Sequence, residues 1–261
     1  MKIALGLEYD GAGFRGWQTQ RDARTVQSCL EAALSRVAAR PIGVHCAGRT
    51  DAGVHAYQQV AHFETLAERS PRAWALGTNA NLPPDISVIW AIPVPDDFHA
   101  RYTATARSYR YVICNRTTRT ALWARKVTWD CRAIAVEPMA HAAEYLCGTH
   151  DFSSFRAAGC QAQHAVRTVI ALTVTRADEY ILFDIEANAF LQHMVRNIVG
   201  TLLEIGRSER PPSWALEVLS AQDRTLAGAT APADGLYFLG ARYPAHFGLP
   251  APKATDVLPL G

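Results

Sequence analysis

The chain has 261 residues, of which 49% are hydrophobic, and its formal net charge is +2. This length suits two modest domains, because domains usually have about 100 to 200 residues. No stretch reaches the roughly 18 consecutive apolar residues that a membrane span needs, so we do not expect a membrane partner. The apolar stretch before Glu8 is too short for a secretory signal, and we expect a cytoplasmic protein.

The six cysteines and nine histidines lack the spacing of a metal site. The cysteines form no Cys-x-x-Cys pair, and the histidines form no His-Glu-x-x-His motif. We therefore expect reduced cysteines and no bound metal.

Hydrophobic periodicity in the first part of the chain predicts a strand, a helix, two strands, a helix and a strand. Thr25 is a candidate N-cap for the first helix, which should end before Pro41. The predicted ranges are 3–9 (strand), 26–37 (helix), 42–46 and 56–63 (strands), 71–79 (helix) and 86–94 (strand).

The same order recurs after Asp97, with one additional short helix before the last strand. The predicted ranges are 105–114 (strand), 137–147 (helix), 168–176 and 180–187 (strands), 190–205 and 213–221 (helices) and 236–243 (strand). The Pro-rich tail after His246 should be loosely held.

Two successive βαββαβ patterns predict an α+β protein built from a duplicated ferredoxin-like unit, in which each half has an antiparallel sheet backed by helices. We place an N-terminal domain at 1–104 and a C-terminal domain at 105–261. Substrate sites often lie in clefts between domains, so a central cleft between the two halves is the expected place for a site.

Between Asp97 and Asp130 the chain has no acidic residue, and cations alternate there with aromatic residues. Guanidinium groups bind phosphates and aromatic rings stack on bases, so this stretch is a candidate RNA or DNA surface. A solvated, arginine-rich face is the alternative interpretation. The cations are Arg101, Arg107, Arg110, Arg116, Arg119, Arg125 and Lys126, and the aromatic residues include Tyr102, Tyr109, Tyr111, Trp123 and Trp129.

A Gly-x-Gly-x-x-Gly pattern at 11–16 follows the first predicted strand, but the next helix begins only near Thr25. In the dinucleotide-binding fingerprint the helix begins inside the glycine run and holds the pyrophosphate, so a nucleotide cofactor is not expected here. The loop is either an RNA contact or an ordinary surface loop. Its candidate contacts are Phe14, Arg15, Trp17, Gln18 and Gln20.

The segment AGRTDAGVHA places Asp51 in a loop between two predicted strands, beside Arg49 and Thr50. An aspartate followed closely by glycine is often only a turn residue. A carboxylate next to cations stays ionised, however, and a loop held between two strands can present it to a cleft as a nucleophile or a base.

Arg196 lies in the predicted helix at 190–205, which is otherwise so apolar that the charge needs a partner from another segment. Its neighbour His193 is more often a core residue than a catalytic one at such a position. In the predicted strand RSYRYVICN, Tyr109 shares one face with Arg107 and Tyr111. Tyr109 is either a packing residue or a plate on which a flipped base stacks.

Eight segments occur in the order YDGAGFRGWQTQ, AGRTDAGVHA, NANLP, DDFHAR, RSYRYVI, DFSSF, NAFLQHMVRNIVGTL and GLYFLGARY. Together they resemble the tRNA pseudouridine synthase A family, from Lys2 to about Tyr243. The resemblance implies a homodimeric enzyme without a cofactor that isomerises uridine at about positions 38 to 40, in the anticodon stem-loop of tRNA. It also implies the pseudouridine synthase fold, with two α/β halves around a cleft.

By the same resemblance, Asp51 would be the nucleophile, Tyr109 would stack on the target base, and Arg196 would pair with Asp51. Arg49 would help to open the stem and would occupy the space left by the flipped uridine. The 14–20 loop would contact RNA, and Arg101 and Arg107 of the basic stretch are further candidates. The segment GLYF stands where GLYL is more usual in the family.

A single carboxylate suits an isomerase better than a hydrolase, because glycoside hydrolysis typically uses two. Two alternatives stay open at this point. One is an RNA N-glycosidase, although no second acid accompanies Asp51. The other is a non-catalytic RNA-binding protein, although the chain lacks the expected aromatic-rich RNP1 run.

Overall fold

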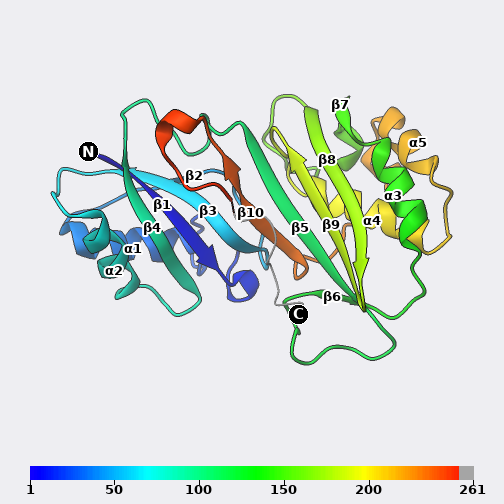
Figure 1. Ribbon diagram of the computed structural model, residues 1–261, viewed down its shortest axis with the longest axis horizontal. Coiled ribbons are helices and arrows are strands. Elements are labelled where there is room, and N and C mark those ends of the chain that lie inside the picture. The colour runs from blue at the N-terminus through cyan, green and yellow to red at the C-terminus, as the bar shows by residue number, and fades with distance from the viewer. Residues whose placement is uncertain (253–261) are drawn as a thin grey trace. The chain divides into compact units, whose positions relative to one another are not determined.

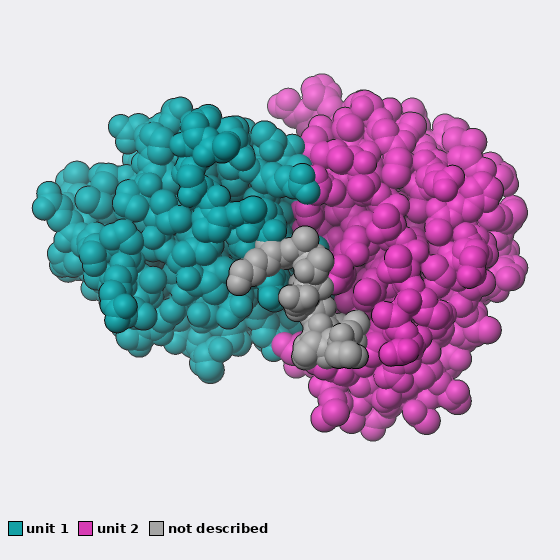
Figure 2. Space-filling model, in the orientation of Figure 1, with its two compact units in different colours: residues 1–107, 237–261 teal, residues 108–236 magenta. Residues whose placement is uncertain are grey.

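The computed structural model describes residues 1–252 of the chain, which form two compact units (Figure 2). The first unit consists of residues 1–107 and the C-terminal residues from 237 onward, and the second consists of residues 108–236. The boundary that we expected between residues 104 and 105 lies close to this division. The last strand, expected in the second half, is grouped with the first unit, where it pairs with a strand.

The first unit contains a sheet in the strand order β4–β1–β3–β10 (Figure 1). Strand β1 runs antiparallel to β3 and β4, the short β2 pairs antiparallel with β3, and β10 runs parallel to β3. Sequence predicted these strands, but the one expected at 42–46 is only two residues long. The bounds are β1 (Lys2–Tyr9), β2 (His45–Cys46), β3 (His55–Glu64), β4 (Ile86–Val94) and β10 (Leu236–Arg242).

Helices α1 (Val26–Ala38) and α2 (Pro71–Asn79) pack against each other, and α2 also packs on β4. Helix α1 begins with a capping box, in which Thr25 and Ser28 each accept a hydrogen bond from the other's backbone N–H. Helix α2 begins with Ser70 as its cap and proline at its first position. Both predicted helices are therefore confirmed, and their start signals are the reason.

The second unit contains strands in the order β5–β9–β8–β7, with β6 parallel to β5. Helix α3 packs on α4 and on β8 (Figure 1). Strands β6 and β7 were not predicted, because they are short and their sequences do not alternate between apolar and polar residues. The bounds are β5 (Ala106–Asn115), β6 (Thr128–Asp130), α3 (Val136–Glu144), β7 (Gly148–Asp151), β8 (Val166–Ala177), β9 (Tyr180–Ala187), α4 (Met194–Gly206) and α5 (Trp214–Ala221).

Helix α4 begins at Met194 and not at residue 190 as predicted. The preceding residue, His193, has a φ of 61°, in the left-handed region that a helix cannot contain. The apolar residues Phe190 and Leu191 continue the helical period in the sequence, but they lie in the turn before the helix.

The segment after β10 packs on the first unit as far as the last described residue. The Phe247 ring is 6% exposed and lies 5.2 Å from the Phe98 ring, measured between centroids. Gln58 Nε2 donates a hydrogen bond to the carbonyl of Pro250 at 3.2 Å. The expectation of a loosely held tail is therefore wrong for residues 247–252, because an aromatic anchor and a hydrogen bond hold it. The rest of the tail lies outside the described residues.

None of the helices in the described part of the chain has the length and apolar character that a membrane crossing requires.

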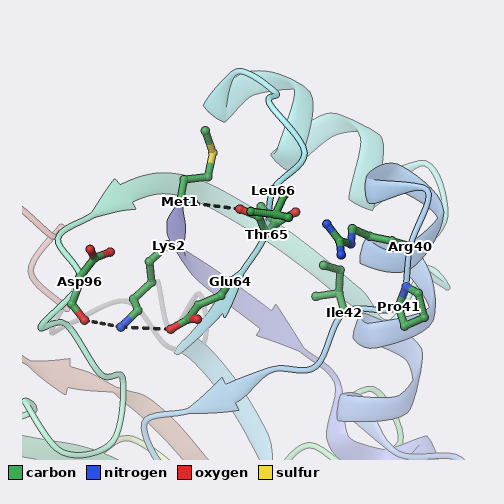
Figure 3. Close-up of a pocket in the computed structure, with 9 residues that line it drawn as sticks. All are labelled: Met1, Lys2, Arg40, Pro41, Ile42, Glu64, Thr65, Leu66 and Asp96. Carbon is green, nitrogen blue, oxygen red and sulfur yellow. Dashed lines mark hydrogen bonds and ion pairs between the residues drawn. The ribbon is translucent and has the colours of Figure 1, made fainter.

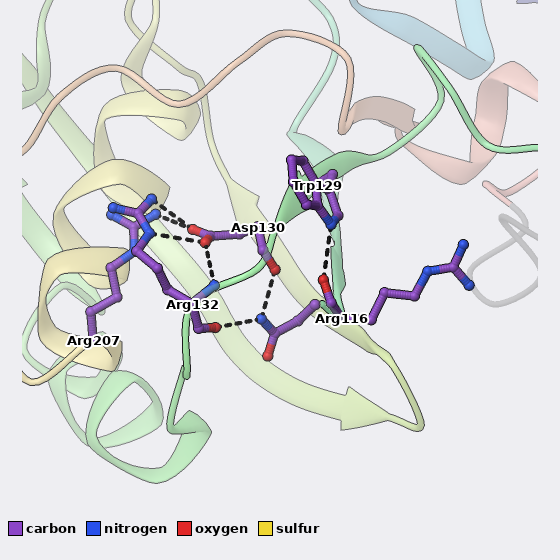
Figure 4. A network of polar contacts seen from close by, with 6 residues as sticks. Arg116, Trp129, Asp130, Arg132 and Arg207 are labelled. Atoms are coloured by element: carbon purple, nitrogen blue, oxygen red, sulfur yellow. Dashed lines mark hydrogen bonds and ion pairs between the residues drawn. The ribbon is translucent and has the colours of Figure 1, made fainter. Parts of the chain in front are cut away.

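A buried carboxylate links β6 to the end of α4 in the second unit (Figure 4). Asp130, whose side chain is 5% exposed, accepts hydrogen bonds from Arg132 Nε and Nη2, both at 2.9 Å, and from Arg207. Burial alone would raise the pKa of Asp130, but the hydrogen bonds from the two guanidinium groups outweigh it and lower the pKa to about 2.

We predict that Asp130→Asn lowers the free energy of unfolding by about 2 kcal/mol at neutral pH, because the arginines lose their charge partner. The folded pKa lies below the usual aspartate value of 3.8, so this contribution is present above pH 3.8 and is lost as the pH falls toward about 2. Urea unfolding of both proteins between about pH 7 and about pH 2 measures the difference. A difference that does not shrink in acid would contradict an ionic role for Asp130.

Candidate active site

Asp51 lies in the loop at 47–54, between β2 and β3 of the first unit. Its backbone carbonyl accepts a hydrogen bond from Val54 N–H at 3.2 Å, so Asp51 does begin a turn. The loop is held from outside by the segment that follows β1. Trp17 N–H donates to the Thr50 carbonyl at 3.0 Å, and Gly53 N–H donates to the Phe14 carbonyl at 3.4 Å. The half-buried carboxylate is thus carried on a backbone that a second loop holds in place.

The glycines at 11–16 allow two backbones to approach closely. A Cβ on Gly11 would lie 1.9 Å from the Val54 carbonyl oxygen, and one on Gly16 would lie 2.7 Å from the Thr50 carbonyl oxygen. Gly16 also has a φ of +89°, which disfavours other residues. Gly11 and Gly16 therefore have a structural reason that differs from nucleotide binding, namely contact with the Asp51 loop, whereas Gly13 faces the side chains of Arg24 and Asp85.

Buried polar side chains support the same loop from the sheet. The hydroxyls of Tyr9 and Thr50 share a hydrogen bond of 2.8 Å, and Gln59 Nε2 donates to the Gly48 carbonyl at 2.7 Å. Gln59 is 0% exposed, and its Nε2 also donates to the Tyr9 hydroxyl at 3.4 Å. Burial raises the pKa of the Tyr9 phenol above its usual range, so this hydroxyl stays protonated.

Arg107, expected at an RNA surface, is buried and holds backbone instead. Its Nε and Nη2 donate to the Ala47 carbonyl at 3.4 and 3.3 Å, at the start of the Asp51 loop. Its Nη1 donates to the Ala104 carbonyl at 3.1 Å, and Nη2 also donates to the Arg101 carbonyl. The structure thus gives Arg107 a role in holding backbone, and a contact of Arg107 with RNA stays a prediction.

Two of the aromatic residues expected to contact RNA are also buried. Phe14 is 4% exposed, and the Arg24 guanidinium carbon lies over it, 4.1 Å from the centroid of the Phe14 ring. Trp17 is 2% exposed. Their burial removes these two rings from the candidate RNA surface. Arg15 and Gln20 are exposed, as is Arg101, and Gln18 is half-buried, so these four remain candidates.

The expected alternation along β5 is confirmed, because Tyr109 and Tyr111 are buried while Ser108 and Arg110 are half-buried. The Tyr109 ring packs edge to face with Phe190, at 5.0 Å between centroids and 83° between planes.

The basic stretch is partly neutralised by acids from elsewhere in the second unit. Arg110 forms a bidentate ion pair with Asp184, at 2.7 and 2.9 Å. Arg116 Nη1 donates to both carboxylate oxygens of Glu179, at 3.0 and 3.1 Å. The absence of acids in the local sequence therefore overstated the charge of this surface.

Arg196 lies in the first turn of α4 and is half-buried. Its Nε donates to the Ala231 carbonyl at 2.7 Å, and Ala231 N–H donates to the Arg196 carbonyl at 3.1 Å. Next to it, fully buried Asn197 donates to the Phe155 carbonyl and accepts from Arg224. These bonds hold the start of the helix, and pairing of Arg196 with Asp51 stays a prediction.

A cavity of about 450 Å³ lies elsewhere in the first unit, beside the start of β1 (Figure 3). Its charged lining residues are Lys2, Arg40, Glu64 and Asp96. Lys2 Nζ lies 3.5 Å from Glu64 Oε1 and donates to the Asp96 carbonyl. The opposite charges compensate each other, and the sequence-predicted site residues do not line this cavity.

Within residues 1–252, no three His, Cys, Asp or Glu side chains are grouped so that they could hold a metal ion.

A family model described as "tRNA pseudouridine synthase" matches residues 7–103 and 142–244. The chain belongs to this family. It is 57% identical over 256 residues to tRNA pseudouridine synthase A of Hydrogenovibrio crunogenus, with 98% of each chain covered. It is 56% identical to that of Nitrosococcus oceani, with 96% of each covered, and 55% identical to that of Klebsiella pneumoniae, with 100% of this chain and 94% of the relative covered. The resemblance seen in the sequence is confirmed.

For a member of this family, the residues that sequence reasoning missed are those that support the Asp51 loop. Tyr9 and Gln59 were not singled out, although both are polar residues at inward positions of predicted strands. Gln58 and Gln59 interrupt an otherwise apolar strand, and that interruption was the available signal. Arg107 was singled out as an RNA contact and not for the backbone that it holds.

We predict that the Thr50 hydroxyl stabilises the Asp51 loop. Thr50→Val keeps the shape but removes the shorter of the two hydrogen bonds of the buried Tyr9 hydroxyl, and it should lower the free energy of unfolding by about 1 to 2 kcal/mol. Amide hydrogen exchange in residues 47–54 should become faster. Thr50→Ser retains a hydroxyl and is the matched control. Equal stability and equal exchange in the two variants would contradict this support.

Proposed function

We propose that this chain isomerises uridine to pseudouridine in the anticodon stem-loop of tRNA, at about positions 38 to 40, with Asp51 as the nucleophile. The observation that carries the proposal is a half-buried aspartate on a loop held from two sides, in a chain that relatives named tRNA pseudouridine synthase A match over 96% or more of its length. The proposed enzyme acts as a cytoplasmic homodimer and needs neither a metal nor a cofactor.

The reaction breaks the bond from N1 to C1′, turns the base and forms a bond from C5 to C1′. N1 gains a proton and C5 loses one, so the sum of the atoms is unchanged. The uracil must stay in the site while it turns. One carboxylate is enough for this, because no water has to be activated as in hydrolysis. Asp51 attacks C1′, adds at C6, or labilises the base.

The other residues have proposed roles around this step. Arg196 pairs with Asp51 and keeps it ionised and oriented, while Tyr109 stacks on the flipped uracil. Arg49, two residues before Asp51, enters the stem in place of the uridine. Extruding a base costs a few kcal/mol and costs least where pairing is weak, which fits a substrate at the end of a stem.

The contacts with the rest of the tRNA are proposed for Arg15, Gln18, Gln20 and Arg101. These side chains are exposed or half-buried, whereas the other three candidates are buried. Contacts to phosphates provide affinity without reading sequence, so recognition should depend mainly on the shape of the tRNA.

An unmodified tRNA transcript with tritium at uridine C5 tests the proposed activity and separates it from both alternatives. An isomerase releases the label without free uracil, an N-glycosidase liberates uracil, and a binding protein does neither. We predict label release by the wild type and a loss of turnover in Asp51→Asn and Asp51→Ala.

Binding in the Asp51 variants is the control for this prediction. Their affinity for tRNA should stay within about tenfold of the wild type, because phosphate contacts supply most of the binding. Turnover by Asp51→Asn at the wild-type rate would refute the proposed nucleophile. Loss of binding together with loss of activity would indicate a structural role for Asp51.

We predict a different pattern at Tyr109. Tyr109→Phe keeps the ring and should retain most of the turnover, whereas Tyr109→Ala loses the ring and should lower kcat strongly. Since Tyr109 is buried against Phe190, thermal unfolding of both variants must accompany the kinetics. Equal activity of the two variants would remove the stacking plate from the mechanism.

A further inference from the structure

Tyr102, in the connection between β4 and β5 of the first unit, is an exposed ring that is held in place. It is 75% exposed, yet its ring stacks on His99 at 4.3 Å between centroids and 30° between planes. A tyrosine that serves only to fill a core would be buried. This ring is supported on one side and presents most of its surface to solvent.

The turn that carries Tyr102 is held by His99. The Nδ1 atom of His99 accepts hydrogen bonds from the backbone N–H groups of Arg101 at 3.1 Å and Tyr102 at 3.3 Å. The Thr103 hydroxyl donates to the His99 carbonyl at 2.7 Å. Because the histidine ring binds the same backbone that it stacks beside, the orientation of Tyr102 is set before any ligand arrives.

Two further histidines lie behind His99 and connect it to the sheet. His62 on β3 lies 4.6 Å from His99, and His45 on β2 lies 5.3 Å from it, between ring centroids. His62 is 3% exposed, and its Nδ1 accepts a hydrogen bond from Ala100 N–H at 3.2 Å. The exposed tyrosine thus stacks on His99, which in turn packs edge to face on buried His62.

The positive charge beside the Tyr102 ring comes from arginine. Burial, together with the neighbouring histidines and Lys2, lowers the pKa of His62 to about 3 and lowers that of His99. The Arg101 guanidinium, which is exposed, lies 5.7 Å from the Tyr102 ring centroid. A flat aromatic face beside an arginine matches a nucleotide, whose base stacks and whose phosphate binds the guanidinium.

This surface is connected to the Asp51 loop through buried Arg107. One guanidinium donates to the Arg101 carbonyl, beside Tyr102, and to the Ala47 carbonyl, where the Asp51 loop begins. Tyr243 adds a second anchor, because its hydroxyl donates to the Ala100 carbonyl at 2.6 Å. The turn with Tyr102 and the loop with Asp51 are therefore held in register by hydrogen bonds within one unit.

We propose that Tyr102, backed by His99 and flanked by Arg101, is a stacking platform for a nucleotide of the tRNA close to the target uridine. The inference rests on the proposed function and adds a contact to it. Stacking on an aromatic ring tolerates every base, since each base has a π-face. Such a platform suits an enzyme that acts at neighbouring positions with different flanking nucleotides.

A second histidine–tyrosine pair in the chain offers a matched control. Tyr145, at the end of α3, lies 5.5 Å from His141 between ring centroids, and its hydroxyl is bonded to His141 Nε2 at 3.3 Å. Tyr145 is half-buried and follows Glu144 in the sequence, whereas Tyr102 follows Arg101. It therefore shares the ring pairing of Tyr102 but not its exposure or its cation.

The experiment compares Tyr102→Ala, Tyr102→Phe, Arg101→Ala and Tyr145→Ala in the full chain, with an unmodified tRNA transcript. Filter binding gives Kd at several salt concentrations, tritium release gives kcat and KM, and thermal unfolding verifies the fold. Tyr102→Ala should raise Kd and KM about tenfold with little change in kcat. Tyr102→Phe should have a Kd and a KM within about twofold of the wild type. Tyr145→Ala should have the wild-type Kd and KM.

Salt dependence separates stacking from charge. Tyr102→Ala should leave the slope of log Kd against log salt unchanged, because a ring contact releases no counterion. Arg101→Ala should reduce the magnitude of that slope by about one. A general loss of structure in the turn would alter both variants in the same way.

The outcomes distinguish this inference from the proposed function. Label release by the wild type, with Kd and KM of Tyr102→Ala equal to those of the wild type, overturns the platform and leaves the proposed function standing. Equal losses in Tyr102→Ala and Tyr102→Phe also overturn it, because the ring would not be the binding group. Without label release by the wild type, the proposed function fails, and the platform fails with it.

Discussion

The close approach of two backbones, at 11–16 and at 47–54, is the constraint on which the candidate site depends. Gly11 and Gly16 lie so near the carbonyls of Val54 and Thr50 that a side chain at either position would push the Asp51 loop away. Buried Tyr9 and Gln59 hold the same loop from the sheet. A nucleophile that must meet one atom of a flipped base benefits from such support, because a displacement of about 1 Å costs much of the rate.

Much of the fold could be predicted from local signals. Helix α2 and strand β4 have the predicted bounds, because Ser70 and Pro71 mark a helix start and a turn-forming sequence separates the two elements. Where a local signal was missing, prediction failed. His193 has a left-handed backbone conformation, and α4 therefore begins only at Met194. Glycine is the usual sequence signal for this conformation, and position 193 is not a glycine. The short strands β6 and β7 depend on pairing with the longer strands β5 and β8, which periodicity does not reveal.

The candidate site was only partly predictable, because sequence patterns identify residue types and not their partners. Asp51 could be recognised from the resemblance of its motif. The Tyr9 hydroxyl, 41 residues from Thr50 in the chain, could not be assigned to it from spacing. Arg107 was read as a surface cation, yet the carbonyls of Ala47 and Ala104 surround its guanidinium. Composition suggested that the Arg107 charge binds RNA, but in the folded protein this charge binds backbone carbonyls.

Internal partners of the arginines limit how the chain can bind RNA. Arg110 and Arg116 are engaged by Asp184 and Glu179, and buried Arg107 contacts carbonyls, so three of the expected cations have internal partners. Affinity would then depend more on the remaining cations and on uncharged contacts such as base stacking. A ring held at a set position contributes most in this situation, because its ordering cost is met during folding and not during binding. The exposed Tyr102 meets that requirement, because buried Arg107 binds both the turn that carries Tyr102 and the Asp51 loop.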